Sequence, residues 1–190
     1  MSSDAQAPYV EGISYRDKLP IDWVVVAGLP SAGEQHRLDR ANEALLQQLL
    51  LKDELHLQEH EDVDEGGYRE HLLRLEAKLD LLVGLVTEMV AVNGNLPSRH
   101  DLVLGTHGLC VFQPGEHPSS LKEGVLLRIR LYLDTHFPHP LELFATLVNT
   151  QMDSFSVELC PVEAHLQDLL DKFVFRQHRR DIAFRKRGNT

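Results

Sequence analysis

The most regular pattern of apolar positions lies in residues 68–92, where apolar side chains follow one another at intervals of 4, 3, 4, 3, 4 and 3. An unbroken heptad pattern of this kind predicts a helix that supercoils with a partner helix, because its apolar stripe is narrower than the face that most globular helices bury. The sequence therefore predicts an oligomerisation element. Its seam consists of Tyr68, Leu72, Leu75, Leu79, Leu82, Val86 and Met89.

The positions beside this seam indicate the number of helices. With Leu72 at position a, Glu76 falls at e and Lys78 at g, as a two-stranded coil requires. The later e and g positions are apolar, and a dimer would leave them in water, whereas a four-helix arrangement, or packing on the chain's own domain, would cover them. We therefore predict a homotetramer, with a dimer as the second choice. These later residues are Val83, Leu85, Val90 and Val92.

An intrachain helical hairpin is the alternative to an intermolecular bundle. A second apolar stripe occurs in the helix expected over residues 34–56, so that this helix could cover the heptad seam within one chain. Sustained heptads over three or more repeats nevertheless favour the intermolecular interpretation. The stripe consists of Leu38, Ala41, Leu45 and Leu49, broadened by Leu46 and Leu50.

The rest of the chain has a β pattern. Residues 20–27 form the first expected strand, rich in β-branched and aromatic side chains, and Trp23 is expected in the core. After the helical segment, short strands are expected over 108–112, 125–133, 141–148 and 155–159, followed by a helix over 161–175. This order predicts an α+β fold: a small antiparallel barrel or sandwich with a C-terminal helix, interrupted after its first strand by two long helices.

Charge is distributed unevenly along the 190 residues. The formal net charge is −10, but the segment from Asp171 onward carries +5, so the rest carries −15. The acidic body disfavours nucleic acid as a partner, and the basic end is either a solvated terminus or a surface for an acidic protein partner. The basic residues that we expect on this surface are Arg176, Arg179, Arg180, Arg185, Lys186 and Arg187.

The location expected from the sequence is the cytoplasm. No apolar run reaches the ~20 residues that a membrane span needs, and the polar start of the chain does not look like a secretion signal. Cys110 and Cys160 lie in apolar, strand-like contexts, as free thiols do when they pack as small hydrophobic residues.

The β half of the chain resembles a PilZ domain. The resemblance rests on the glycine-turn segment 104–112, the glycine-led strand from Gly124, two further strands and the closing helix that ends near Phe175. It covers residues 19–27 and 100–187 and implies a six-stranded antiparallel barrel with a C-terminal helix, whose usual role is bacterial cyclic di-GMP reception. The implied organisation is a flexible N-terminus (1–18), a PilZ-like barrel (19–30 and 97–187) and an inserted helical hairpin (31–96).

The motifs that bind cyclic di-GMP in this family are altered here. The first, R-x-x-x-R, supplies two guanidinium groups for phosphate and guanine, but four residues after Arg16 the chain has Pro20, and Lys18 does not restore the pair. In the second, D/N-x-S-x-x-G, alignment on Gly108 places Val103 and Gly105 at the polar positions. A separate R-x-x-x-R at Arg176 and Arg180 lies past the barrel and is interpreted as coincidence.

One further pattern suggests a different chemistry. His56, Glu59 and His60 match H-x-x-E-H, in which two histidines bind zinc and a glutamate activates water. Catalytic zinc needs a third rigid ligand, and none can be assigned, so we interpret these residues as a solvated face and expect no metal, cofactor or catalytic residue.

These observations predict a non-enzymatic bacterial regulatory or scaffold protein. It would be an oligomeric PilZ-like domain that does not bind cyclic di-GMP and acts through contacts with an unidentified protein. The resemblance to the PilZ family implies that it acts in a bacterial process such as type IV pilus function, motility or virulence. The alternatives are a cyclic di-GMP receptor that uses non-standard residues, and a metallopeptidase built on His56 and His60.

Overall fold

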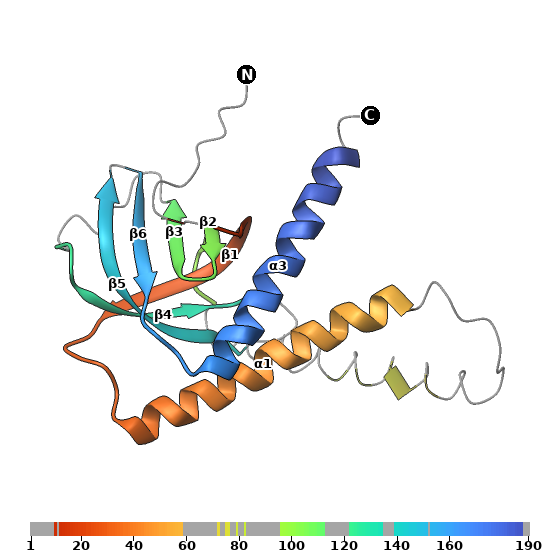
Figure 1. The fold of residues 1–190 in the computed structure, drawn as a ribbon, viewed down its shortest axis with the longest axis horizontal. Helices are drawn as coiled ribbons and strands as arrows, with labels where there is room; N and C mark the ends of the chain where they lie inside the picture. Colours follow the sequence, from red (N-terminus) through yellow and green to blue (C-terminus); the bar gives the residue numbers. More distant parts are fainter. Residues whose placement is uncertain are drawn as a thin grey trace.

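The fold is a barrel of antiparallel strands with two long helices packed against it (Figure 1). The computed structural model describes residues 10, 12–58, 96–112, 122–134, 139–151 and 153–187, together with Leu72, Leu75, Glu76, Leu79 and Leu82; the side chains of residues 53–58 and 184–187 are not described. The predicted α+β class, with helices inserted after the first strand, is confirmed.

The described residues include six strands, which close in the order β1-β2-β3-β6-β5-β4. Strand β1 closes the barrel, because residues 14–20 pair with β2 and residues 21–25 pair with β4. The strands are β1 (Ser14–Val25), β2 (Arg99–Gly105), β3 (Gly108–Phe112), β4 (Leu126–Leu131), β5 (Leu141–Gln151) and β6 (Ser154–Leu159).

Helix α1 (Ala32–Gln58) follows β1, and helix α3 (Ala164–Arg187) ends the described chain. The start of α1 is fixed by a capping box. The Glu34 amide donates to Ser31 Oγ at 3.4 Å, and the Ser31 amide donates to the Glu34 carboxylate at 3.1 Å.

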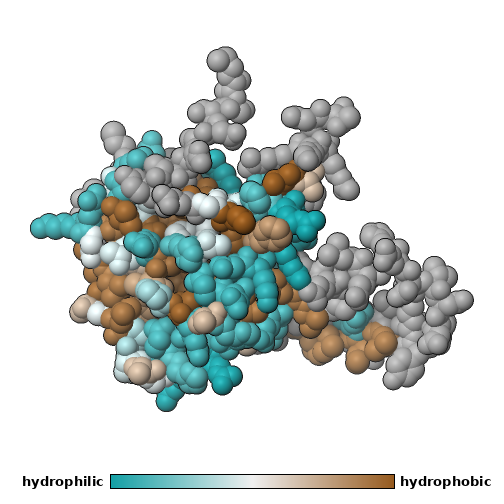
Figure 2. Space-filling view, viewed as in Figure 1, coloured by the Kyte–Doolittle hydropathy of each residue, from teal (hydrophilic) through white to brown (hydrophobic). Residues whose placement is uncertain are grey.

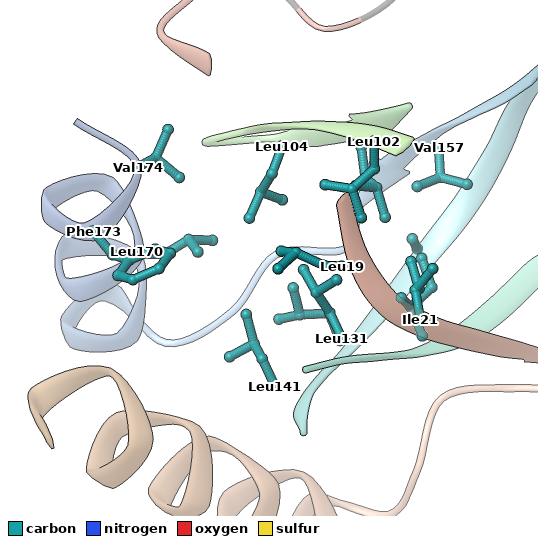
Figure 3. Close-up of a cluster of buried hydrophobic side chains, with 14 of the residues drawn as sticks. Leu19, Ile21, Leu102, Leu104, Leu131, Leu141, Val157, Leu170, Phe173 and Val174 are labelled. Carbon is teal, nitrogen blue, oxygen red and sulfur yellow. The ribbon is translucent and has the colours of Figure 1, made fainter. Parts of the chain in front are cut away.

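Both helices belong to the same hydrophobic core as the barrel. Alternate strand residues such as Leu102, Leu104 and Leu131 point inward, and Leu170 and Phe173 of α3 close one side of the cluster (Figure 3). Helix α1 contributes its own apolar face to this core. It therefore packs as part of the barrel domain, whereas the sequence analysis placed residues 31–96 in a separate helical hairpin. The contributing residues are Leu45, Leu46, Leu49 and Leu50.

Several elements differ from the sequence expectations. Strand β1 begins at Ser14, inside the segment expected to be flexible, because Tyr15 is buried and packs edge-on against Phe173 with ring centroids 6.1 Å apart. Strand β2 was not expected as a strand of its own. Helix α3 continues to Arg187 instead of ending near residue 175.

Trp23 takes the position expected for it. Its ring is partly buried against the core, and its centroid lies 4.9 Å from that of Phe155 and 5.9 Å from that of His100, both in edge-on contacts. Contacts of this kind add to the area that the rings bury.

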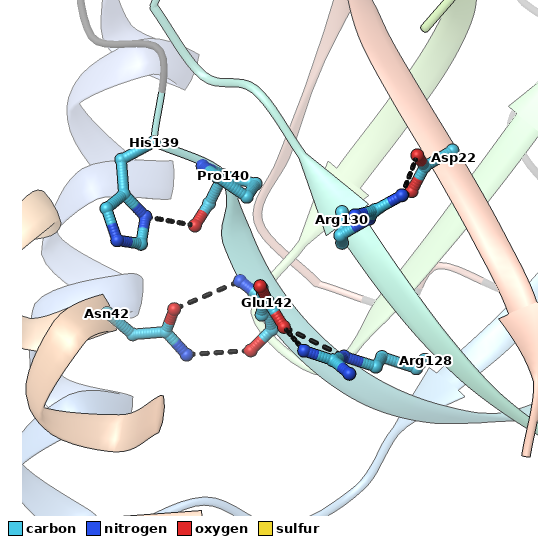
Figure 4. Close-up of polar contacts among 7 residues, drawn as sticks. All are labelled: Asp22, Asn42, Arg128, Arg130, His139, Pro140 and Glu142. Carbon is cyan, nitrogen blue, oxygen red and sulfur yellow. Dashed lines mark hydrogen bonds and ion pairs between the residues drawn. The ribbon is translucent and has the colours of Figure 1, made fainter. Parts of the chain in front are cut away.

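One buried amide attaches α1 to the barrel. The Asn42 side chain is 1% exposed, and its Nδ2 donates to the Glu142 carbonyl at 2.7 Å while the Glu142 amide donates to its Oδ1 at 3.0 Å (Figure 4). The Glu142 side chain points away from α1 and binds Arg128. Asn42 thus forms hydrogen bonds with β5 at Glu142, which precedes the part of β5 that pairs with β6, beginning at Ala145.

In the described residues, no helix is both long and apolar enough to cross a membrane.

We expect Asn42→Ala to lower the stability of the chain by about 2–3 kcal/mol, because it leaves the Glu142 amide and carbonyl without their partner. For a chain of this size the melting temperature should fall by roughly 4–12 °C, measured by circular dichroism. Gln48→Ala, on the exposed side of α1, is the control and should change the melting temperature little. Equal effects of the two substitutions would contradict this role of Asn42.

Candidate functional site

Four leucines of the predicted seam lie in helix and are exposed. Leu72, Leu75, Leu79 and Leu82 are 50%, 56%, 53% and 57% exposed. Their spacing of 3, 4 and 3 places them on one face of a helix. In Figure 2 apolar residues gather on the part of the molecule that extends away from the barrel at the lower right, on either side of a hydrophilic one.

The other residues of this prediction lie outside the described part of the chain. They are Tyr68, Val86 and Met89 of the seam, and Lys78, Val83, Leu85, Val90 and Val92 beside it.

The hairpin alternative required α1 to offer its apolar face to the seam. That face is already used, because Leu45 and Leu46 are 5% and 0% exposed and belong to the core formed with the barrel and α3. In the described residues, α1 therefore does not offer this face to the exposed leucines of residues 72–82.

The first nucleotide motif is represented by a single arginine that already has a partner. Arg16 points outward from β1, opposite Val103 of β2, and its guanidinium carbon lies 5.0 Å from the centre of the Phe112 ring. This is a cation–π contact. Pro20, where the second arginine would stand, is buried in β1 and pairs with Arg99.

At the second motif, Val10 of the N-terminal segment packs against Gly105. A Cβ atom on Gly105, the position aligned with the motif's serine, would overlap Cγ1 of Val10. Val10 is itself 9% exposed. The contact explains why glycine suits this position, and it leaves no room for a serine without movement of Val10.

The basic end of the chain is helical, and part of its charge is used within the chain. An Arg176 guanidinium nitrogen donates to the Leu50 carbonyl of α1 at 2.8 Å, and Arg179 lies over Phe175 with 5.9 Å between its guanidinium carbon and the ring centre. Arg180 lines a cleft beside α1. Arg185, Lys186 and Arg187 belong to α3, with side chains outside the description.

The structure does not describe a site formed by the residues of the H-x-x-E-H pattern. His56 lies in the last turns of α1, while Glu59 and His60 lie outside the described residues. Within the described part of the chain, no group of three or more histidine, cysteine, aspartate or glutamate side chains is placed to hold a metal ion.

The two cysteines are unpaired and differ in environment. Cys110 is buried, and burial raises the pKa of its thiol, whereas Cys160 is partly exposed. His139 is exposed, and its Nδ1 lies 3.1 Å from the Pro140 carbonyl oxygen, while His136 is outside the description.

Sequence reasoning missed Val10, Asn42 and Phe112. Asn42 carries a recognisable signal, because it is a polar residue inside an otherwise apolar helical stripe. The alternation of Tyr15, Asp17 and Leu19 similarly indicates that β1 starts early. The contacts of Val10 and Phe112 join strand positions distant in sequence, and no local pattern marks them.

Comparison with known proteins gives the family. A sequence model described as "Atypical PilZ domain, cyclic di-GMP receptor" matches residues 46–187. The chain belongs to the atypical PilZ domain family. The expected relation to PilZ domains is thereby confirmed. No curated protein matches the chain.

A solved PilZ structure has the same fold. It is a tetrameric PilZ domain of a pathogenic protein from Xanthomonas campestris, described as self-assembled through a helical bundle. The two chains are 24% identical over 91% of each, with a TM-score of 0.67.

Proposed function

We propose that this atypical PilZ domain is a non-enzymatic scaffold of the bacterial cytoplasm that assembles through its heptad helix and acts through protein contacts. The observation that carries the proposal is the exposed leucine stripe over residues 72–82. Full burial of a leucine side chain stabilises by ~2 kcal/mol, so removing the exposed half of four leucines in every chain from water is a strong driving force for association.

A tetramer is the assembly that best fits this stripe. The later e and g positions, among them Val83 and Val90, are apolar, so the apolar face is wider than two helices can cover. The PilZ structure of similar fold is described as a tetramer held by a helical bundle, which supports the same arrangement here.

The native protein should have a mass of four chains in solution at micromolar concentration, measured by sedimentation or light scattering. Replacing Leu75, Leu79 and Leu82 by serine should yield single chains or aggregates, because the seam is lost. Leu51→Ser is the matched control, since Leu51 is 57% exposed but lies on α1. A wild-type mass of one chain would rule the assembly out.

We further propose that this chain has lost the cyclic di-GMP binding that the family's description records. The single arginine of the first motif is stacked on Phe112, and Pro20 replaces the second. At the second motif Val103 and Gly105 offer no polar side chain, and Val10 occupies the space above Gly105. One arginine of the first motif and both polar side chains of the second are therefore missing.

The alternative function is a cyclic di-GMP receptor with non-standard residues, which the family's description favours. Isothermal titration calorimetry of the full chain with cyclic di-GMP distinguishes the two. We expect no measurable heat of binding. Micromolar or tighter binding that is lost in Arg16→Ala would instead establish a receptor that uses the outer face of β1.

The protein contacts of the scaffold are proposed to involve the basic end of α3. This region is the positively charged part of an acidic chain, and charges of opposite sign speed association. Arg176 donates to Leu50 within the chain, so its main role is structural, and the surface is assigned to Arg179, Arg180, Arg185, Lys186 and Arg187. The resemblance to the PilZ family suggests that the output is type IV pilus function, motility or virulence.

Replacing Arg179, Arg185, Lys186 and Arg187 by glutamine, with Arg176 kept, should leave the oligomer intact and weaken partner capture. The loss should be larger at low salt, where electrostatic attraction is less screened. Pull-downs from cell extract at two salt concentrations measure it. Arg37→Gln with Arg40→Gln, on the exposed face of α1, is the control; equal recovery by all variants at low salt would show that α3 does not recognise the partner.

A further inference from the structure

The outer face of α3 carries exposed side chains that alternate between basic and apolar along one line. Phe175 and Ile182 are 45% and 41% exposed, and Lys172 and Arg179 are exposed as well. Successive members of this set are 3, 4 and 3 residues apart, so they follow one another along one side of the helix. These four residues, the outer stripe, lie opposite Phe173, whose ring is buried in the core.

The outer stripe lies on a helix that leaves the barrel. In Figure 1 the C-terminal part of α3 projects beyond the strands, and in Figure 2 apolar residues are visible among hydrophilic ones on this part of the molecule. Single exposed apolar side chains are normal on a protein surface. Here Phe175 and Ile182 are one heptad apart, and the cation of Arg179 stands between them, so the three form a repeating pattern that one partner can match.

Arg179 joins the charged and apolar parts of the outer stripe. Its guanidinium carbon lies 5.9 Å from the centre of the Phe175 ring, in a cation–π contact. The N–H groups at the edge of a guanidinium can donate to a carboxylate while its face rests on a ring. A carboxylate that reaches Arg179 is therefore brought beside an exposed apolar surface.

The charged members of the outer stripe are both basic. They are Lys172 and Arg179, while Asp171 and Asp181 fall outside its spacing and are half-buried. Asp168, four residues before Lys172, is exposed and limits the basic part of this face. A partner with carboxylates opposite the two cations meets charge of opposite sign, whereas a basic partner would be repelled.

An amphipathic helix is the partner that fits this spacing. Helices pack by fitting side chains at intervals of three and four residues between one another, and Phe175 and Ile182 are about 10 Å apart along the axis of α3. A helix with apolar side chains one heptad apart and carboxylates between them matches both parts of the outer stripe. A lipid surface fits less well, because the strongly acidic rest of the chain would be repelled by anionic headgroups.

We propose that the outer stripe of α3 is a docking surface for an acidic amphipathic helix of a partner protein. The apolar side chains of that helix pack on Phe175 and Ile182, and its carboxylates pair with Lys172 and Arg179. This inference rests on the proposed function, since it names the kind of partner that the basic end of α3 binds.

The test uses the full chain and a synthetic, fluorescein-labelled helical peptide of about three heptads, in which leucine and glutamate alternate at intervals of three and four residues along one face. In one matched peptide lysine replaces those glutamates, and in another glutamine replaces those leucines. Fluorescence anisotropy should show that the first peptide binds at least about tenfold more tightly than either matched peptide. Equal binding of the three peptides, or no binding of the first, would overturn the proposal.

Variants of the chain locate the surface. Phe175→Ser and Ile182→Ser should each weaken binding of the first peptide about fivefold at low and at high salt, because each removes apolar contact area. Arg179→Gln should weaken it mainly at low salt. Leu29→Ser is the matched control, since Leu29 is 60% exposed but lies outside α3. Circular dichroism checks folding, and Ile182→Ser alone decides if Phe175→Ser does not fold.

The remaining outcomes distinguish other occupants. Unchanged peptide affinity in Ile182→Ser would overturn the docking surface. A lower solution mass of Ile182→Ser would assign the outer stripe to a second copy of the chain, and binding to vesicles of phosphatidylethanolamine and phosphatidylglycerol that Ile182→Ser abolishes would assign it to a membrane; either result would overturn the proposal. If the peptide fails but the glutamine variants of the basic end still weaken partner capture, the proposed function stands and the helical partner is wrong.

Discussion

The pairing of Asn42 with the backbone of Glu142 is the constraint on which the arrangement of helix and barrel depends. Strand β5 pairs with β4 from Leu141 onward, but β6 joins it only from Ala145, so the start of β5 has a free edge that α1 covers. One amide satisfies both a donor and an acceptor of that edge. Because the same face of α1 carries Leu45 and Leu46 into the core, the helix is fixed in position and in rotation.

Hydrogen bonds also attach α3 to α1 and to β1. Arg176 donates to the Leu50 carbonyl, and His178 Nδ1 lies 2.6 Å from the Ser14 carbonyl oxygen, so α3 is attached to α1 and to the first residue of β1. Lys52 and Asp134 add an ion pair between α1 and the segment after β4. The barrel and both helices therefore form one packed unit.

Sequence patterns predicted the elements better than the contacts between them. The two-residue period of residues 125–133 indicates β4 and its inward-facing Leu127, Ile129 and Leu131, because one face of that strand is buried. The heptad period predicted that Leu72 and Leu79 need a partner, and both are exposed in the single chain. The boundary of the inserted hairpin could not be predicted in this way, because an apolar stripe does not say whether it covers a neighbouring helix or a barrel. Polar Asn42 within that stripe, paired with a residue 100 positions away, decides the question.

The altered nucleotide motifs have two consequences: contacts to a nucleotide are lost, and side chains of the chain itself fill part of the same surface. Absence of an arginine or a serine removes contacts, but Val10 against Gly105 and Phe112 under Arg16 fill the same surface with the chain's own side chains. A surface that is packed in this way contributes to folding and no longer needs a ligand to satisfy it. Recognition by such a chain then depends on how many copies are presented together, because weak contacts made by several subunits at once gain by ~10²–10⁴ when the geometry allows simultaneous binding. The proposed assembly through the exposed leucines of residues 72–82 would supply those copies.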